Sequence, residues 1–316
     1  MRVLFAGTPE AALPTLRALL ASPHEVVGVL TRPDAPAGRQ RRLRASPVAD
    51  VARELGLTVL APASTRDEGL REAVAAMAPD AAAVVAYGNL LRTDLLQVPP
   101  HGWVNLHFSL LPAWRGAAPV QHAIMAGDEI TGATTFRLDE GLDTGPVIGT
   151  LTERVRSQDT AGSMLDRLSG AGAALMVASL DALETGRAQL QAQPTTGVSH
   201  APKLSGRDGQ VRWARPAFAI DRHVRGCTPD PGASTVWRGE RLNLQPLRTG
   251  GRDAAPPPQQ LAIGEVRADK HAVWVGTSTE AVRLGAVQPP GKPFMAAADW
   301  ARGTRPQPGE RFEVDP

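Results

Sequence analysis

Ala81-Ala82-Ala83-Val84-Val85-Ala86 is an uninterrupted apolar run as long as a typical strand. Strands of a parallel sheet are buried on both faces and carry such runs, whereas half-exposed strands alternate apolar and polar residues. Arg2–Ala6 lies before this run and Val104–Phe108 lies after it, and both are short strand candidates. The three segments therefore predict strands of one parallel sheet.

Segments with helical spacing separate these strands. They are Ala11–Leu20, Pro47–Leu55 and Arg66–Met77, and Glu25–Leu30 is a further strand candidate. Asp67-Glu68 would occupy the first turn of the third helix, where the helix dipole favours acidic side chains. This alternation of strand and helix predicts a doubly wound α/β domain.

The pattern continues to about residue 189. Ala133–Leu138 is rich in β-forming residues, and Pro146–Arg154 is its predicted hairpin partner. Ser163–Glu184 predicts a long helix that ends near Gly186, since glycine is common just after a helix.

The second part of the chain has a different character. Residues 190–206 are rich in Gln, Pro, Thr, Gly and Ser and predict a linker. Short apolar runs punctuated by glycine and proline follow, which favours a small β-barrel. We therefore predict a first domain over 1–189 and a second over 207–316, with a loop at Gly250–Gln260 inside the second.

Composition narrows the class of protein. Hydrophobic residues make up 42% of the chain, which excludes a wholly disordered protein. The single cysteine, Cys227, excludes an internal disulfide and every zinc motif with several cysteines. No apolar run is long enough to span a bilayer, and the first residues resemble a strand rather than a secretory signal. We expect a reducing, cytoplasmic location.

Charge is distributed unevenly. Residues 200–316 contain 17 basic and 12 acidic residues, a net charge of +5, although the whole chain carries only +2. A mildly basic second domain is compatible with an anionic partner such as nucleic acid.

The densest group of polar candidates follows the Val104 strand. Asn105 and His107 are two residues apart, so both lie on one face of a strand. They stand near its carboxyl end, where open α/β sheets bind their ligands. The ordinary interpretation is a hydrogen-bonded core histidine and an asparagine at a strand end.

A second candidate is the acidic segment Asp139–Pro146. Its Asp, Gly, Thr and Pro residues are typical of a solvated hairpin turn. A carboxylate from this turn could instead pair with a histidine and support its charged form. With an amide donor beside them to stabilise an oxyanion, such groups suit acyl-type transfer to an amine.

The third candidate is the arginine-rich segment Thr31–Arg44. It contains five arginines and one acid, has no hydrophobic periodicity, and predicts an exposed loop. The loop is either simply solvated or a contact for phosphates.

Several other kinds of site are excluded. The residues after Gly7 lack the spacing of a dinucleotide fingerprint, and no phosphate-binding P-loop or nucleophile elbow occurs. The spacing of His101, His107 and His122 matches no metal motif, so we expect no metal.

At this point a family resemblance becomes clear. The motifs that carry it run in order along nearly the whole chain: Phe5-Ala6-Gly7-Thr8-Pro9-Glu10, Arg32-Pro33-Asp34, Val84-Val85-Ala86-Tyr87-Gly88, Asn105-Leu106-His107, Ser109-Leu110-Leu111-Pro112, Trp114-Arg115-Gly116-Ala117-Ala118-Pro119, Asp139–Pro146 and Ala201-Pro202-Lys203-Leu204. The chain closely resembles the folate-dependent formyltransferases, and among them the methionyl-tRNA formyltransferase family.

The resemblance implies a fold and a reaction. The fold is a Rossmann-like domain followed by a β-barrel of the oligonucleotide-binding (OB) type. The reaction is transfer of the formyl group of 10-formyltetrahydrofolate to methionyl-initiator tRNA in translation initiation. We expect a monomer whose partners are this tRNA and folate.

The resemblance also implies roles for individual residues. The catalytic residues would be Asn105, His107 and Asp143. The residues that contact folate would be Ala86, Tyr87, Gly88, Ser109, Leu110, Leu111 and Pro112. Those that contact tRNA would be Arg39, Arg41 and Arg42.

Two alternatives remain open from the sequence. The first is a folate-dependent formyltransferase that acts on a small amine, which would need neither the arginine loop nor a basic second domain. The second is a folate- or RNA-binding module without catalysis, against which the intact Asn105, His107 and Asp143 set argues.

Overall fold

The central strand is β6 (Ala81–Val85), and every one of its residues is buried. It lies in a seven-stranded sheet of order β5-β2-β1-β6-β7-β8-β9. The strands are parallel from β5 to β7, and β8 and β9 add an antiparallel edge. The computed structural model, which describes residues 1–37, 42–248, 258 and 261–313, therefore confirms the predicted Rossmann-like α/β class.

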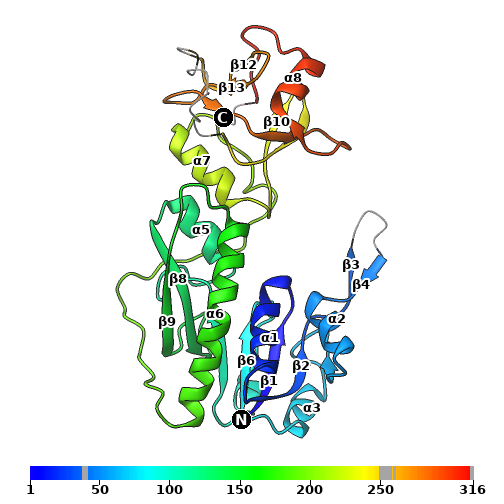
Figure 1. The fold of residues 1–316 in the computed structure, drawn as a ribbon, viewed down its shortest axis with the longest axis vertical. Helices are drawn as coiled ribbons and strands as arrows, with labels where there is room; N and C mark the ends of the chain where they lie inside the picture. Colours follow the sequence, from blue (N-terminus) through cyan, green and yellow to red (C-terminus); the bar gives the residue numbers. More distant parts are fainter. Residues whose placement is uncertain (38–41, 249–257, 259–260, 314–316) are drawn as a thin grey trace. The chain divides into compact units, whose positions relative to one another are not determined.

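Up to residue 184 the other elements follow in chain order (Figure 1). They are β1 (Arg2–Gly7), the 3-10 helix η1 (Glu10–Ala12), α1 (Leu13–Leu20), β2 (Glu25–Leu30), β3 (Ala35–Ala37), β4 (Arg42–Arg44), α2 (Pro47–Glu54), β5 (Val59–Leu60), α3 (Leu70–Ala76), α4 (Thr93–Leu96), β7 (Trp103–His107), α5 (Pro119–Ala126), β8 (Ile130–Arg137), β9 (Val147–Arg154) and α6 (Ala161–Glu184).

Helices cover both faces of the sheet. Trp103 on β7 packs in a cluster with Leu70 and Val74 of α3 and with Leu95 of α4. Leu106 points to the opposite face, where it meets Gly172 of α6 so closely that a Cβ there would lie 2.8 Å from its side chain. Residues two apart on a strand share a face, so Asn105 and His107 lie on the Trp103 side.

The third predicted helix is shorter than expected. We predicted Arg66–Met77, but α3 begins only at Leu70. Gly69 precedes it with a φ of +81°, a left-handed conformation outside the helix. Asp67 accepts a hydrogen bond from the Ser64 N–H at 3.2 Å and so belongs to a turn rather than to a first helical turn.

The arginine-rich segment is not a plain loop. β3 and β4 form a two-stranded antiparallel hairpin, in which Ala35 pairs with Arg44 and Pro36 with Leu43. Sequence periodicity missed these strands because each has only three residues. Arg39 and Arg41 lie outside the described residues, and Arg42 begins β4.

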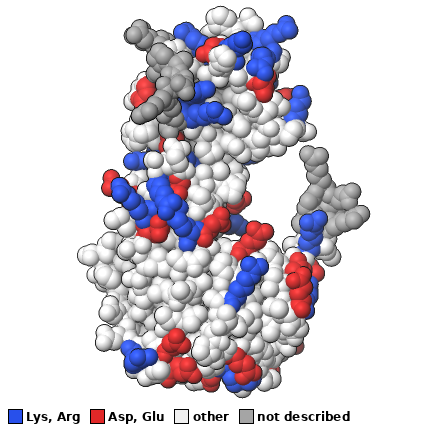
Figure 2. Space-filling view, viewed as in Figure 1, with Lys and Arg blue, Asp and Glu red and all other residues white. Residues whose placement is uncertain are grey.

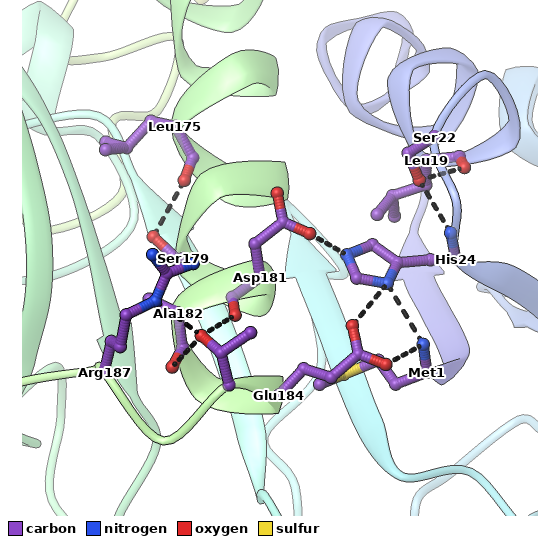
Figure 3. A network of polar contacts seen from close by, with 11 residues as sticks. Met1, Leu19, Ser22, His24, Leu175, Ser179, Asp181, Ala182, Glu184 and Arg187 are labelled. Carbon is purple, nitrogen blue, oxygen red and sulfur yellow. Dashed lines mark hydrogen bonds and ion pairs between the residues drawn. The ribbon is translucent and has the colours of Figure 1, made fainter.

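A polar network ties the end of α6 to the start of the sheet (Figure 3). Asp181 and Glu184 point from α6 toward His24, whose ring nitrogens lie 3.2 Å and 3.8 Å from their carboxylates. The Met1 ammonium donates to Glu184 at 2.8 Å. His24 is buried, so these acidic partners offset the cost of placing its polar ring there.

The later part of the chain is an antiparallel β structure with two helices. Its elements are α7 (Ala217–Gly226), β10 (Ala233–Trp237), β11 (Glu240–Leu244), β12 (Val266–Ala268), β13 (Val273–Val275), β14 (Val282–Arg283), β15 (Ala286–Gln288), β16 (Met295–Ala296) and α8 (Ala297–Thr304). The strands form sheets of order β10-β11-β15-β16 and β12-β13-β14. This confirms the predicted β class, whereas α7 and α8 were not predicted.

Aromatic side chains form the centre of this β structure. Trp213 stacks on Phe312 at 5.4 Å between ring centroids, and Trp237 and Trp300 pack edge to face at 5.3 Å. Trp213 donates its indole N–H to Thr235 at 2.9 Å, so its one polar atom is satisfied.

The chain folds into two compact units. The first comprises Met1–Pro119, Ile130–Arg154 and Leu165–Ala201, and the second comprises Val120–Glu129, Val155–Met164 and Pro202–Pro316. Within the described ranges, no helix has the length and apolarity needed to cross a membrane.

Candidate active site

Asn105 and His107 stand on β7, between the parallel strand β6 and the antiparallel strand β8. Asn105 pairs with Val84 on one side and with Phe136 on the other. His107 is 6% exposed, and its ring meets the edge of Phe136 with centroids 6.4 Å apart. Asn105 is only half-buried, and no side-chain hydrogen bond to it occurs within the described residues. Its amide is therefore available to a ligand.

The segment after β7 folds back over the histidine. The Ser109 hydroxyl donates to the Ala113 carbonyl at 2.6 Å, which closes a tight turn. Thr134 of β8 donates to the Ser109 carbonyl at 2.7 Å and accepts from the Leu111 N–H at 3.2 Å. These bonds hold Ser109 to Pro112, four of the residues expected to contact folate, in one fixed conformation.

The turn places the Trp114 carbonyl against the histidine ring. The Trp114 oxygen lies 2.8 Å from His107 Nε2. A carbonyl oxygen can only accept, so Nε2 must carry a proton. In the neutral ring the lone pair is then on Nδ1.

Asp143 faces that lone pair. Its Oδ2 lies 3.8 Å from His107 Nδ1, beyond direct hydrogen-bond distance but close enough for a strong charge interaction. The Gly116 N–H donates to the same Oδ2 at 2.7 Å. The acidic turn and the histidine, which the family resemblance implies belong to one site, do lie side by side.

Glycine is required at position 116. Its φ is +125°, and a Cβ there would lie 2.6 Å from the Ala201 carbonyl oxygen. No L side chain fits both the conformation and the space. The backbone N–H that fixes the Asp143 carboxylate thus depends on the absence of a side chain.

The groups around His107 shift its pKa in opposite directions. Burial lowers the pKa of His107, and this effect is the largest, whereas the Asp143 charge and the Trp114 carbonyl raise it. His107 is therefore neutral near pH 7, with an unprotonated Nδ1 beside a carboxylate. A proton arriving at Nδ1 would be stabilised at once by Asp143, which is what a proton acceptor needs.

Gln193 is a site residue that sequence reasoning missed. Its side-chain amide donates to the Asp143 carbonyl at 2.8 Å and to the Gly145 carbonyl at 2.9 Å. Its own carbonyl accepts from the Arg115 guanidinium. Gln193 therefore joins the Asp143 turn to the segment that carries Gly116. Its position in the predicted linker concealed it, since nothing distinguishes it there from neighbouring polar residues.

We expect Gln193→Ala to lower kcat about three- to tenfold, because the Asp143 turn loses two hydrogen bonds and two partly buried carbonyls lose their donor. Steady-state kinetics of the proposed reaction would measure this. Gln191→Ala is the matched control, since that side chain is exposed and makes no described hydrogen bond. A change below twofold in both variants would contradict the positioning role.

The residues after β6 lie at the point where the strand order reverses. β1 pairs with β2 on one side and with β6 on the other, and open α/β sheets bind their ligands beyond the carboxyl ends of the strands at such a point. The Thr8 hydroxyl, which follows β1, donates to the Tyr87 carbonyl, which follows β6, at 2.8 Å. Ala86 and Gly88 are exposed with left-handed φ values of +48° and +87°.

Buried polar atoms in the segment after β6 fit a polar heterocycle. Tyr87 is 2% exposed, burial raises the pKa of its hydroxyl, and its ring packs in the core. Neither the Tyr87 Oη nor the neighbouring Asn89 Nδ2 makes a well-formed hydrogen bond in the described part of the chain. The two side chains lie beside each other, and Asn89 lowers the pKa of the Tyr87 hydroxyl against the larger effect of burial. Buried polar atoms without a well-formed hydrogen bond suit a ligand rich in donors and acceptors.

One group of side chains elsewhere could hold a metal by its composition. His24, Asp181 and Glu184 place ligand atoms within 4.8 Å of one another. The ion pairs of these side chains with each other and with the Met1 ammonium already explain why they lie so close together (Figure 3).

Comparison with known proteins adds a family assignment to this geometry. A formyl transferase family model matches residues 1–180, and a formyl transferase C-terminal domain model matches residues 203–305. The chain is 58% identical over 314 residues to a methionyl-tRNA formyltransferase of Nocardioides sp., covering 99% of this chain and 98% of that protein. It is 57% identical to the enzyme of that name from Streptomyces coelicolor, with coverage of 98% and 99%.

Solved structures show the same fold at low identity. HypX from Aquifex aeolicus, in complex with tetrahydrofolic acid, matches all of this chain with a TM-score of 0.67 and 19% identity, and the match spans 51% of HypX. A methionyl-tRNA formyltransferase from Clostridium thermocellum matches 79% of this chain and 94% of its own, with a TM-score of 0.59 and 16% identity.

Proposed function

The chain belongs to the formyl transferase family, and we propose that it transfers the formyl group of 10-formyltetrahydrofolate to the α-amino group of methionine on initiator tRNA. The main structural support for this reaction is the placement of His107. Its Nε2 lies against the Trp114 carbonyl and its Nδ1 faces Asp143. The near full-length likeness to methionyl-tRNA formyltransferases supports the choice of substrates.

His107 serves as the proton acceptor. An amine attacks a formyl carbon through its lone pair and becomes positively charged as the new C–N bond forms. The Nδ1 atom, unprotonated in the neutral ring, takes the amine proton directly or through one water. The resulting imidazolium has Asp143 on one nitrogen and the Trp114 carbonyl on the other.

Asn105 stabilises the oxygen that gains charge. As the amine attacks, the formyl oxygen becomes an oxyanion and needs a hydrogen-bond donor. The Asn105 amide lies on the same face of β7 as His107 and has no described partner of its own. The imidazolium then returns its proton to the folate nitrogen that leaves, which completes the transfer without a net change in the enzyme.

The remaining site residues are proposed to bind the two substrates. Ala86, Tyr87 and Gly88 would contact the pterin end of the folate, beyond the carboxyl ends of β1 and β6. Ser109, Leu110, Leu111 and Pro112 would contact it along the segment after β7. We also propose that the protein is a monomer, which light scattering of the purified protein would test, and that it works in the cytoplasm, which fractionation of cells would test.

The arginine-rich segment is proposed to contact the tRNA. Substituting Arg39, Arg41 and Arg42 together by alanine should raise KM for methionyl-tRNA about tenfold or more and weaken its dependence on salt. The KM for folate should change less than twofold. Arg53→Ala, an exposed arginine paired with Asp34, is the control for loss of positive charge nearby. An unchanged KM for methionyl-tRNA in the triple variant would show that the segment does not contact tRNA.

The proposed reaction is tested by supplying formyltetrahydrofolate with one acceptor at a time. Formyl-methionyl-tRNA should form from methionyl-tRNA, and free methionine and uncharged tRNA should give no product. Formylation of soluble amines without tRNA would instead support the small-amine alternative. Absence of any product with folate bound would support the non-catalytic alternative.

A further inference from the structure

The chain after α6 returns along the first unit and contacts the candidate active site at two points. Residues 191–201, which we name the connecting segment, begin beside β9, where Gln191 pairs with Val147 (Figure 1). The connecting segment contains no Lys, Arg, Asp or Glu, so it adds nothing to the charged groups that Figure 2 marks in blue and red. Hydrogen bonds hold it in place. Gln193 makes the first contact with the site, and Ser199 makes the second.

Ser199 holds the peptide group that faces His107. Its hydroxyl accepts a hydrogen bond from the Trp114 N–H at 2.9 Å, and its carbonyl accepts one from the Arg115 N–H at 2.9 Å. The Arg115 N–H and the Trp114 carbonyl belong to one planar trans peptide, so they point in opposite directions. Because Ser199 binds one edge of this peptide, the carbonyl on the other edge is directed at His107 Nε2, 2.8 Å away.

Trp114 depends on such contacts for its conformation. Its φ is +59°, in the left-handed region that a bulky side chain rarely adopts. A residue stays in this region only where its surroundings hold it there. The Ser199 hydroxyl binds the N–H of Trp114, and the His107 ring binds its carbonyl. Loss of the hydroxyl would therefore free Trp114 to relax and its carbonyl to turn away from His107.

The Trp114 carbonyl also decides which ring nitrogen of neutral His107 carries the proton. The carbonyl lies 2.8 Å from Nε2, whereas the Asp143 carboxylate lies 3.8 Å from Nδ1. A carboxylate is intrinsically the stronger acceptor, and only the closer contact at Nε2 outweighs it. If the carbonyl turned away, the proton would move to Nδ1 and pair with Asp143. Nδ1 could then no longer accept a proton.

We propose that Ser199 is a positioning residue for formyl transfer, whose hydroxyl holds Trp114 so that neutral His107 keeps its proton on Nε2. The effect on the rate rests on the proposed function, whereas the effect on the ring does not. Ser199 touches neither His107 nor Asp143 and acts only through the Trp114 backbone. The segment that joins the two units therefore also determines the protonation pattern of the catalytic histidine.

The first test needs no turnover. The full-length protein is labelled with the heavy nitrogen isotope in its histidines, and NMR reads the shifts of the two ring nitrogens, which differ between a protonated and an unprotonated nitrogen. The signals of His107 are those missing from His107→Gln. Wild type should carry the proton on Nε2. In Ser199→Ala the ratio of Nδ1–H rings to Nε2–H rings should rise about fivefold, the effect of losing one net hydrogen bond.

Two further variants serve as controls. Ser199→Thr keeps the hydroxyl, so it should keep the wild-type ratio and keep kcat within about twofold of wild type. Thr196→Ala removes an exposed hydroxyl from the same connecting segment, where it has no hydrogen bond to the described residues, and should change neither quantity. A wild-type ratio in Ser199→Ala, or an equal change in Ser199→Ala and Ser199→Thr, would overturn the proposal.

The second test measures the reaction. Ser199→Ala should lower kcat about fivefold, in proportion to the loss of Nε2–H rings, with KM for folate and for methionyl-tRNA within about twofold of wild type. A raised KM with unchanged kcat would show that Ser199 serves substrate binding instead, and would overturn the positioning role. A wild-type protein that makes no formyl-methionyl-tRNA would defeat the proposed function, and the ring nitrogens of His107 would still decide whether Ser199 fixes the proton on Nε2.

Discussion

His107→Gln is expected to lower kcat for formyl transfer about a hundred- to a thousandfold, the usual cost of removing a general base or an oxyanion donor. Glutamine keeps similar volume and can still donate an amide hydrogen to the Trp114 carbonyl, as His107 does at 2.8 Å. It cannot accept a proton at the position of Nδ1. The loss therefore measures proton transfer rather than packing.

Single-turnover formylation with both substrates saturating would measure this effect. The KM values for folate and tRNA should stay within about threefold of wild type, because the fold around β7 is kept. His101→Gln is the control, since His101 lies before the same strand and only its backbone N–H has a described partner, the Asp80 carbonyl. A His107→Gln variant with more than a tenth of the wild-type rate would disprove the assignment.

Asp143→Asn is expected to lower kcat about a hundredfold and to change the titration of His107. Asparagine can still accept the Gly116 N–H bond, so the turn should persist. The negative charge 3.8 Å from Nδ1 is lost, and with it the stabilisation of the imidazolium that forms during transfer.

The direction of the pKa change follows from the charges. Asp143 raises the pKa of His107 against the larger, lowering effect of burial. Removing the carboxylate must therefore lower the pKa of His107 further, so the neutral ring persists to lower pH. NMR titration of the His107 imidazole in the two proteins would show the shift. Asp143→Asn should therefore lower both the pKa of His107 and kcat.

Asp139→Asn is the control for this experiment. Asp139 lies in the same acidic turn and accepts hydrogen bonds from Gly141 and Thr144 that an asparagine oxygen can keep. It should leave both kcat and the His107 pKa unchanged within error. A His107 pKa that rises in Asp143→Asn, or shifts equally in both variants, would show that Asp143 does not act on the ring as proposed.

The first unit could be predicted largely because its strands are buried on both faces. Ala81–Val85 is a continuous apolar run of the kind that a covered parallel sheet carries, and the predicted strand Val104–Phe108 overlaps β7 (Trp103–His107). The order of such segments along the chain indicates the strand–helix alternation. Asn105 and His107 could be placed on one face because strand geometry has a period of two. That Asp143 would approach them followed from family resemblance and not from spacing.

Other parts were missed for local reasons. The third predicted helix, Arg66–Met77, starts too early. Helix-forming residues precede Gly69, but the left-handed backbone at Gly69 separates them from α3. α7 was not predicted, although Ala217, Ile220 and Val224 repeat at helical spacing and are all buried. Charged residues between them interrupt the apolar pattern, so the segment contains no apolar run.

The Gln193 contact could not be predicted from composition. A segment rich in Gln, Pro and Thr has no periodic pattern when it runs along a surface and is held by single hydrogen bonds. Residues 190–201 do so: Gln191 pairs with Val147, Ser199 accepts from the Trp114 N–H, and Ala201 pairs with Arg115. Tertiary contacts rather than local propensity determine such a segment.

The aromatic centre of the second unit has a spectroscopic consequence. Four of the six tryptophans, Trp213, Trp237, Trp274 and Trp300, belong to that unit and are all less than a tenth exposed. Intrinsic fluorescence during denaturation is therefore weighted toward the second unit, while far-ultraviolet circular dichroism also records the 24-residue helix α6, most of which belongs to the first. Recording both signals on one sample therefore compares the unfolding of the second unit with that of the whole chain, without any label.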